Sequence, residues 1–121
     1  MNTLGIIGGM SPESTVSYYQ IINREINSRL GGNSSADLLM HSVNFETIAA
    51  LQRTGDWQAA GKVLAASAVK LEQMGAQAIV LATNTMHKVA PTIEAAVSVP
   101  LIHVVDATAA AIKVQNLRQV A

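Results

Sequence analysis

Polar side chains that could do chemistry gather at residues 83–87, directly after an apolar run at residues 78–82. They are Thr83, Asn84 and Thr85, followed after one methionine by His87. The apolar run predicts a strand buried on both faces, and threonine and asparagine at its end are typical helix N-caps. Ligands of open parallel sheets lie beyond the carboxyl ends of the strands, where helix N-termini present free amides. These side chains therefore stand at an expected ligand position, although a plain helix cap without a ligand explains them equally well.

A glycine loop near the N-terminus is the second candidate. An apolar run at residues 3–7 ends in Gly8, Gly9 and Met10, and Ser11 followed by Pro12 then gives a strong helix start. The loop has neither the GxGxxG pattern nor the GK[ST] of a Walker loop. Its amides could cradle a small anion beside the helix N-terminus. A tight turn that needs glycine only for steric reasons is the competing interpretation, and it is favoured for the loop taken alone.

The histidines and one arginine are weaker candidates. His87 lies one helical turn after Thr83 and could act as the base that activates its hydroxyl, but a surface or interface histidine is the plainer interpretation. We expect His41 and His103 to be packed and hydrogen-bonded. Arg53 could hold a substrate carboxylate as a bidentate fork. A solvated residue at the end of a short helix explains Arg53 slightly better.

Length and composition limit the class of protein. The chain has 121 residues, which predicts one domain, and its 8 basic and 8 acidic residues give a net charge of +0. This balance argues against nucleic acid as a partner, and its weak self-repulsion favours a homo-oligomer, which we expect to be a dimer. The chain has no cysteine and only 3 dispersed histidines, so we expect no disulfide and no metal site. There is neither a signal peptide nor an apolar stretch of membrane-spanning length, which predicts a cytoplasmic protein.

The pattern of the whole chain predicts alternating strands and helices. Strands are expected at residues 3–7, 36–43, 78–82 and 100–105, with a fifth beginning at 117–121. Helices are expected at residues 12–30, 47–53, 57–74, 84–97 and 107–115, with a kink or break near Ala90 caused by Pro91. We expect the first helix to bury Val16, Tyr19, Ile22 and Ile26, and the third to bury Ala60, Leu64, Ala68 and Leu71.

Such alternation predicts an α/β fold with a parallel sheet, right-handed crossovers and helices on both faces. The expected strand order is 2-1-3-4, with a possible place for a fifth strand. This order brings the ends of the first and third strands side by side. The glycine loop and residues 83–85 would then border one crevice.

Three motifs, taken in order, carry a resemblance to a known family. They are GIIGGMSPEST at residues 5–15, SVNF at 42–45 with Gln52 and Arg53 following, and ATNTMHK at 82–88. Together they resemble the aspartate/glutamate racemase superfamily, most of all its aspartate-racemase branch with the broad-specificity amino-acid racemases. The resemblance implies proton exchange at the α-carbon of an amino acid between two similar α/β domains, without pyridoxal phosphate or another cofactor. The expected binding partner is a small amino acid or dicarboxylate. The chain resembles only the N-terminal domain, with residues 117–121 leading onward.

The resemblance also implies a set of site residues. Thr83 stands at the position of the family's first catalytic cysteine, which threonine replaces in some members of the branch. A threonine hydroxyl is not appreciably deprotonated without an adjacent base, whereas a cysteine can be a thiolate near neutral pH. Thr83 would therefore donate or relay a proton, or would only orient the substrate. The implied substrate-binding residues are Gly9, Met10, Ser11, Gln52, Asn84 and Thr85, with His87 and Arg53 in possible support.

Three functions are compatible with the sequence. The first is a racemase whose N-terminal half, on its own, does not racemise, because proton exchange needs groups on both faces of the α-carbon. The second is a non-catalytic module that binds a small carboxylate, which Thr83 in place of a thiol supports. The third is a structural fragment that dimerises through an exposed face.

Overall fold

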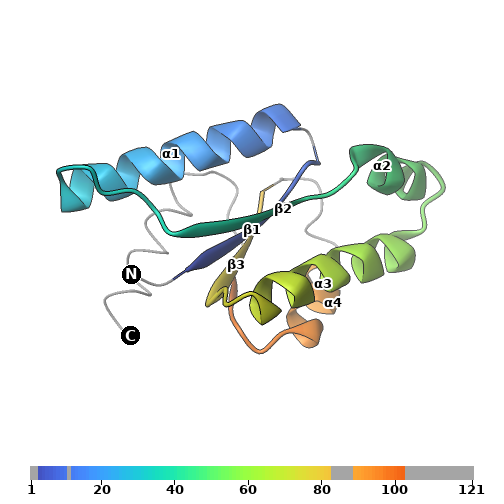
Figure 1. The fold of residues 1–121 in the computed structure, drawn as a ribbon. Helices are drawn as coiled ribbons and strands as arrows, with labels where there is room; N and C mark the ends of the chain where they lie inside the picture. Colours follow the sequence, from blue (N-terminus) through green and yellow to red (C-terminus); the bar gives the residue numbers. More distant parts are fainter. Residues whose placement is uncertain (1–2, 11, 83–88, 103–121) are drawn as a thin grey trace.

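The computed structural model describes residues 3–10, 12–82 and 89–102 (Figure 1). The expected end of the fourth strand, the helix at 107–115 and the strand start at 117–121 lie outside these residues. The described part contains a parallel sheet with helices on both of its faces. The α/β class expected from the sequence is therefore confirmed.

The sheet has four strands in the order β2-β1-β3-β4, as predicted. They are β1 at Leu4–Gly8, β2 at Leu38–Ser42, β3 at Ala78–Leu81 and β4 at Leu101–Ile102. In the parallel register Ile7 of β1 lies opposite His41 of β2 and Leu81 of β3. The carboxyl ends of these three strands therefore meet at one edge of the sheet.

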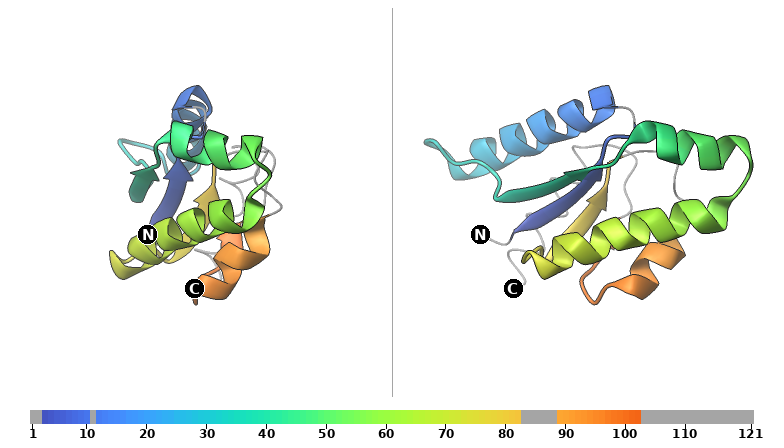
Figure 2. Two further views of the ribbon diagram at one scale, coloured as in Figure 1. Left: turned by 90° about the vertical axis from the view of Figure 1, so that its right-hand side faces the viewer. Right: turned by 45° about the vertical axis from the view of Figure 1, so that its right-hand side comes forward.

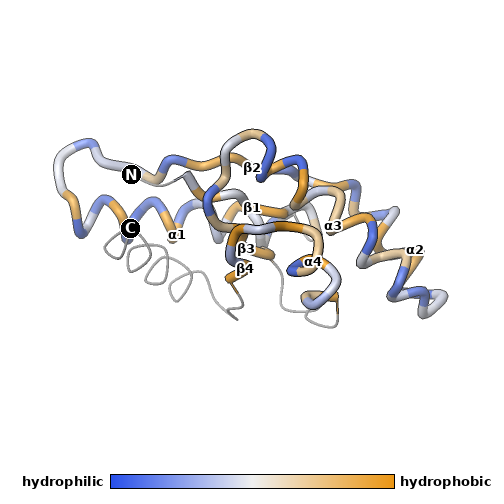
Figure 3. The backbone as a smooth tube through the Cα atoms, turned by 90° about the horizontal axis from the view of Figure 1, so that it is seen from below, coloured by the Kyte–Doolittle hydropathy of each residue, from blue (hydrophilic) through white to orange (hydrophobic). Residues whose placement is uncertain are grey.

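Helices cover the two faces of the sheet unequally. The helix α1 at Pro12–Leu30 lies on one face, whereas α3 at Trp57–Gln73 and α4 at Ala90–Ala96 lie on the other (Figures 1 and 2). The short helix α2 at Phe45–Arg53 lies beyond the carboxyl ends of the strands. In Figure 3 the central strands are mainly hydrophobic, whereas α1 alternates between hydrophobic and hydrophilic residues, as expected for a helix with one buried face.

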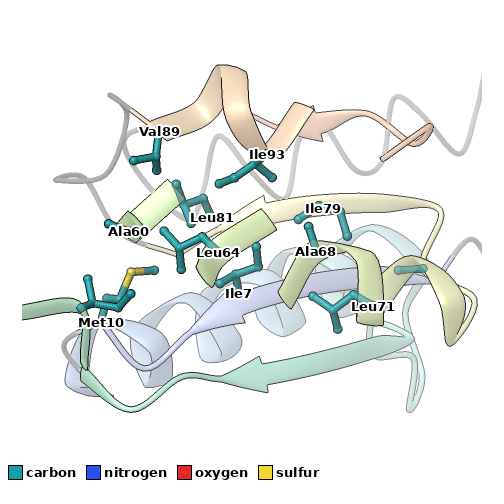
Figure 4. Close-up of a cluster of buried hydrophobic side chains, with 12 residues drawn as sticks. Ile7, Met10, Ala60, Leu64, Ala68, Leu71, Ile79, Leu81, Val89 and Ile93 are labelled. Carbon is teal, nitrogen blue, oxygen red and sulfur yellow. The ribbon is translucent and has the colours of Figure 1, made fainter. Parts of the chain in front are cut away.

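Two hydrophobic clusters hold these layers together, because alternate residues of each strand point to opposite faces. Under α1, the side chains of Leu4 and Ile6 pack with Val80 and with Ile22 and Ile26. The other cluster joins the opposite face of the sheet to α3 and α4, and its members include Ile7, Ile79, Leu81, Leu64, Leu71 and Ile93 (Figure 4). The core stripe predicted for α3 is confirmed, since Ala60, Leu64, Ala68 and Leu71 are all buried.

Helix ends follow local chemistry. The Asp56 side chain accepts a hydrogen bond from the Ala59 N–H at 3.1 Å and so caps α3, as predicted. The Asn44 side chain caps α2, which begins two residues before the expected start. The helix α4 begins at Ala90 with Pro91 in its first turn, where the missing N–H of proline costs nothing. This start agrees with the expected break, while the predicted helical residues 84–88 lie outside the described part.

Two predictions for the buried face of α1 are wrong. Val16 is 54% exposed and Tyr19 is 48% exposed. The buried line of the helix instead consists of Thr15, Tyr18, Ile22 and Ile26. Residues three or four apart share a helix face, and the adjacent pairs 15/16 and 18/19 both satisfy that spacing. At positions 15 and 16 the more apolar residue, Val16, is the wrong choice. The buried residue is Thr15, whose hydroxyl has a hydrogen-bond partner within the protein.

Glu72 and Ser98 join the end of α3 to the segment before β4. One carboxylate oxygen of Glu72 accepts hydrogen bonds from the Ser98 backbone N–H at 2.9 Å and from the Ser98 hydroxyl at 2.6 Å. The Ile79 N–H in turn donates to the Pro100 carbonyl at 2.9 Å. These contacts fix the approach of β4 to the sheet. Within the described residues, no helix is both long enough and apolar enough to cross a membrane.

Candidate functional site

The ends of β1 and β3 are joined by a backbone hydrogen bond. The Ala82 N–H donates to the Ile7 carbonyl oxygen at 3.0 Å, and Ala82 is fully buried. Ile7 is followed by the glycine loop, and Ala82 is followed in the sequence by Thr83. The residue before the predicted catalytic position therefore lies beside the start of the loop. Ser11, Thr83, Asn84, Thr85 and His87 are outside the described residues, so their own places in the site stay predictions.

Close contact with the end of β2 requires a glycine at position 9, the second glycine of the loop. The Val43 N–H donates to the Gly8 carbonyl oxygen at 2.8 Å, which draws the two chains together. Gly9 has a φ of +92°, and a Cβ added to it would lie 2.3 Å from the Val43 carbonyl oxygen. No larger residue fits at that distance or favours that backbone conformation. The steric interpretation of the loop is thus correct, and anion binding by the loop stays a prediction beside it.

Thr15 of α1 is a contact of the loop that the sequence did not suggest. Its Oγ1 accepts a hydrogen bond from the Gly9 N–H at 2.9 Å, and the residue is only 5% exposed. A Cβ on Gly8 would lie 2.5 Å from the Thr15 methyl carbon. The feature of the sequence that could have indicated this contact is a hydroxyl in the first turn of a helix that directly follows a glycine loop. The Gly9 N–H therefore has a partner within the protein, and the substrate contact predicted for Gly9 stays a prediction.

Met10 turns its side chain into the protein. The residue is 3% exposed and belongs to the same cluster as Ile7, Ile48 and Leu81 (Figure 4). The side chain therefore fills the core between the sheet, α2 and α3. A substrate contact by Met10 would have to come from its backbone.

Gln52 and Arg53 end the helix α2, which Ile48 anchors in the core. Gln52 is half-buried, and its predicted role in substrate binding is still untested. The Arg53 guanidinium pairs with a Glu46 carboxylate oxygen at 2.7 Å, and the two side chains are 64% and 72% exposed. Such exposed pairs contribute little to stability. The arrangement matches the solvated alternative for Arg53 and leaves the substrate contact a prediction.

His41 is packed and hydrogen-bonded, as expected. Its Nδ1 shares a short hydrogen bond with the Ser67 hydroxyl, and Ser67 is 1% exposed on α3. The pair links the edge strand β2 to the helix that covers it. Among residues 3–10, 12–82 and 89–102, no group of three or more histidine, aspartate or glutamate side chains is placed to hold a metal ion.

The fold is an α/β domain in which the carboxyl ends of β1 and β3 lie side by side, the place where open parallel sheets generally bind ligands. The model of the Asp/Glu/Hydantoin racemase family matches residues 7–121. The chain therefore belongs to this family.

Individual relatives agree with the family match. Over 108 residues the chain is 31% identical to the broad-specificity amino-acid racemase RacX of Bacillus subtilis (strain 168), covering 87% of the chain and 47% of RacX. A crystal structure from Yersinia pestis, provisionally assigned as an Asp/Glu racemase, superposes with a TM-score of 0.85 at 52% identity. That match covers 96% of the chain and 50% of the Yersinia protein.

A second solved structure is PH1733, an aspartate racemase homologue from Pyrococcus horikoshii OT3. It superposes with a TM-score of 0.73 at 35% identity, covering 84% of the chain and 44% of PH1733. The chain thus spans about half the length of each of these relatives.

Proposed function

We propose that the chain is the N-terminal half of a cofactor-independent racemase for amino acids of the aspartate/glutamate type. The pairing of β1 with β3 carries the proposal, because it brings Ala82, which precedes Thr83, to the start of the glycine loop. Two strand ends that meet in this way can direct donors from both segments to one small carboxylate. Membership of the racemase family supports the same reaction class.

The proposed chemistry is acid–base exchange at the α-carbon. Racemisation needs a proton to leave one face of the substrate and another to arrive on the opposite face. In this proposal Thr83 serves one face as donor or relay, with His87 as its base, and the second half of the enzyme serves the other. Backbone amides and hydroxyls at the two helix starts hold the substrate carboxylate, for which no full positive charge is required.

This mechanism predicts that the 121-residue chain alone does not racemise. The test is incorporation of deuterium from D2O at the α-position of aspartate and glutamate. It is run on the chain alone and on the chain joined to the second half of the Yersinia pestis relative. Exchange should appear only in the joined protein. Robust exchange by the chain alone would overturn the requirement for a second half.

A non-catalytic module that binds a small carboxylate is the alternative. The threonine at position 83, where the resemblance puts a cysteine, favours it, since the hydroxyl is a much weaker acid than a thiol. Binding of succinate without α-exchange, even by the joined protein, would select this alternative. Exchange that disappears in Thr83→Val of the joined protein would select the racemase.

Self-association is part of the proposal for the assembled protein, which we take to be a homodimer. The zero net charge supports it, as do Val16, Tyr19 and Phe45, which are 54%, 48% and 41% exposed. Sedimentation velocity at several concentrations tests it. A strict monomer at every concentration would count against the dimer.

A further inference from the structure

The conformation of the glycine loop depends on one buried hydroxyl of α1. We propose that Thr15 is a positioning residue for the substrate carboxylate, acting through the Gly9–Met10 segment; this inference rests on the proposed function. Thr15 itself is buried and lies behind the loop, so it would not touch the substrate. Its effect would come from fixing which backbone donors the loop presents.

Contacts on three sides hold the loop. From α1, the Thr15 hydroxyl accepts the Gly9 N–H at 2.9 Å. From the end of β2, the Val43 N–H donates to the Gly8 carbonyl at 2.8 Å. On the side of α2 and α3, Met10 is buried in the hydrophobic cluster. A loop held in this way has its donors in place before a ligand arrives, which lowers the entropic cost of binding.

Each part of the Thr15 side chain has a separate task. The hydroxyl oxygen gives the Gly9 N–H a partner inside the protein, so this donor points away from the ligand position. The methyl group occupies the space that a Cβ on Gly8 would need, only 2.5 Å away. Valine would keep the branched shape and lose the acceptor, while serine would keep the acceptor and lose the methyl. The two variants therefore separate hydrogen bonding from packing.

A matched control is available on the other side of the sheet. Ser67 of α3 is also a buried hydroxyl, 1% exposed, with a hydrogen bond to His41. Ser67→Ala removes a buried hydrogen bond and leaves the glycine loop intact. It reports how much of any effect comes from lower stability alone.

The experiment uses the whole chain and succinate as the carboxylate probe. Succinate affinity is measured for the parent, Thr15→Val, Thr15→Ser and Ser67→Ala. Amide hydrogen exchange of Gly9 is followed without ligand, relative to the Ala82 N–H, which also has a buried backbone partner. The ratio of the two exchange rates changes when the loop alone is released, and Ser67→Ala shows how far a general loss of stability moves the same ratio.

We expect Thr15→Val to weaken succinate binding about tenfold and to raise the Gly9-to-Ala82 exchange ratio by a similar factor, as for the loss of one buried hydrogen bond. Thr15→Ser and Ser67→Ala should stay within about twofold of the parent in both measurements. The positioning role would be overturned if Thr15→Val bound succinate as tightly as the parent. It would also be overturned if Thr15→Ser or Ser67→Ala lost as much succinate affinity as Thr15→Val. Either result would leave the proposed function standing. Absence of succinate binding by the parent itself would contradict the proposed function and this role with it. If Thr15→Val does not fold, a parent Gly9 N–H that exchanges like a free amide would still overturn the inference.

Discussion

Gly9 lies so close to Val43 that a Cβ on the glycine would stand 2.3 Å from the Val43 carbonyl oxygen and 2.7 Å from its nitrogen. The backbone of the loop is therefore pressed against the end of β2, at the edge where the strands meet. Because Gly9 also has a φ of +92°, two separate costs oppose any side chain at this position. The relationship makes the loop a fixed part of the sheet edge.

Gly9→Ala should destabilise the protein more than an alanine at another left-handed glycine. Gly55 is the matched control, since it has a φ of +73° and a Cβ there would meet nothing within 4 Å. We expect Gly55→Ala to lower the free energy of unfolding by about 1–2 kcal/mol, the cost of the backbone conformation alone. Gly9→Ala should lose clearly more, because backbone atoms must also move. Urea unfolding of both variants measures the difference, and equal losses would contradict the close contact.

The neighbouring residues Gln52 and Arg53 should differ in their effect on carboxylate binding. Arg53 is exposed and already paired with Glu46, so Arg53→Gln should change succinate affinity by less than about threefold and stability by no more than about 1 kcal/mol. Gln52→Leu should weaken succinate binding by about tenfold if Gln52 holds the carboxylate through one hydrogen bond. Calorimetric titration of the two variants decides the assignment. A large loss with Arg53→Gln would make the guanidinium the anchor instead.

Glu72 should make the unfolding of the protein depend on acid pH. Hydrogen bonds from the Ser98 hydroxyl, and next from the Ser98 backbone N–H, hold the pKa of the Glu72 carboxyl below its usual value of 4.5. A pKa lowered in the folded state contributes stability that is present above the unfolded value and is lost as the pH falls through the folded value. The contribution should therefore be complete above about pH 4.5 and disappear below it.

Two variants test this contribution. Glu72→Gln should unfold more easily than the parent in urea at pH 7, and the difference should shrink near pH 3. Ser98→Ala keeps the backbone N–H at 2.9 Å and loses only the hydroxyl, so its effect should be in the same direction and smaller. An unchanged pH dependence in Glu72→Gln would show that this carboxylate does not stabilise the fold.

Ser67→Ala should lower the free energy of unfolding by about 1–2 kcal/mol, because it leaves the half-buried His41 without its partner on α3. Ser17→Ala is the control, since Ser17 is an exposed serine on α1 and should change stability by less than about 0.5 kcal/mol. Thermal unfolding compares the two. Equal stability of both variants would indicate that the contact between His41 and Ser67 contributes nothing.

The sheet and its third helix could be predicted because local signals and packing agree there. Asp56 is a strong N-cap, Gly75 has a positive φ at the end of α3, and the buried stripe between them follows one helical period. The parallel sheet follows from the alternation of strands and helices, and the strand order matches one of the common arrangements of such sheets. Those features depend on short-range chemistry and on general rules of parallel sheets.

The environment of the glycine loop could not be predicted in the same way. The Thr15 hydroxyl and the Val43 N–H both bond to backbone atoms of the loop, and hydropathy and periodicity do not record such contacts. Met10 was interpreted from its position in the loop, whereas the direction of its side chain depends on the packing of α2 and α3. Val16 and Tyr19 show the same limit, because adjacent residues of a helix can satisfy one spacing equally well.

The most direct test of a carboxylate site shared by β1 and β3 is to map succinate onto the backbone amides of the labelled chain by NMR. We predict that amides at residues 10–11 and at 84–85 shift together and saturate with a single dissociation constant, because one carboxylate is held by both strand ends. Shifts in only one of these segments, two unrelated dissociation constants, or shifts confined to another part of the sheet would contradict a shared site between β1 and β3.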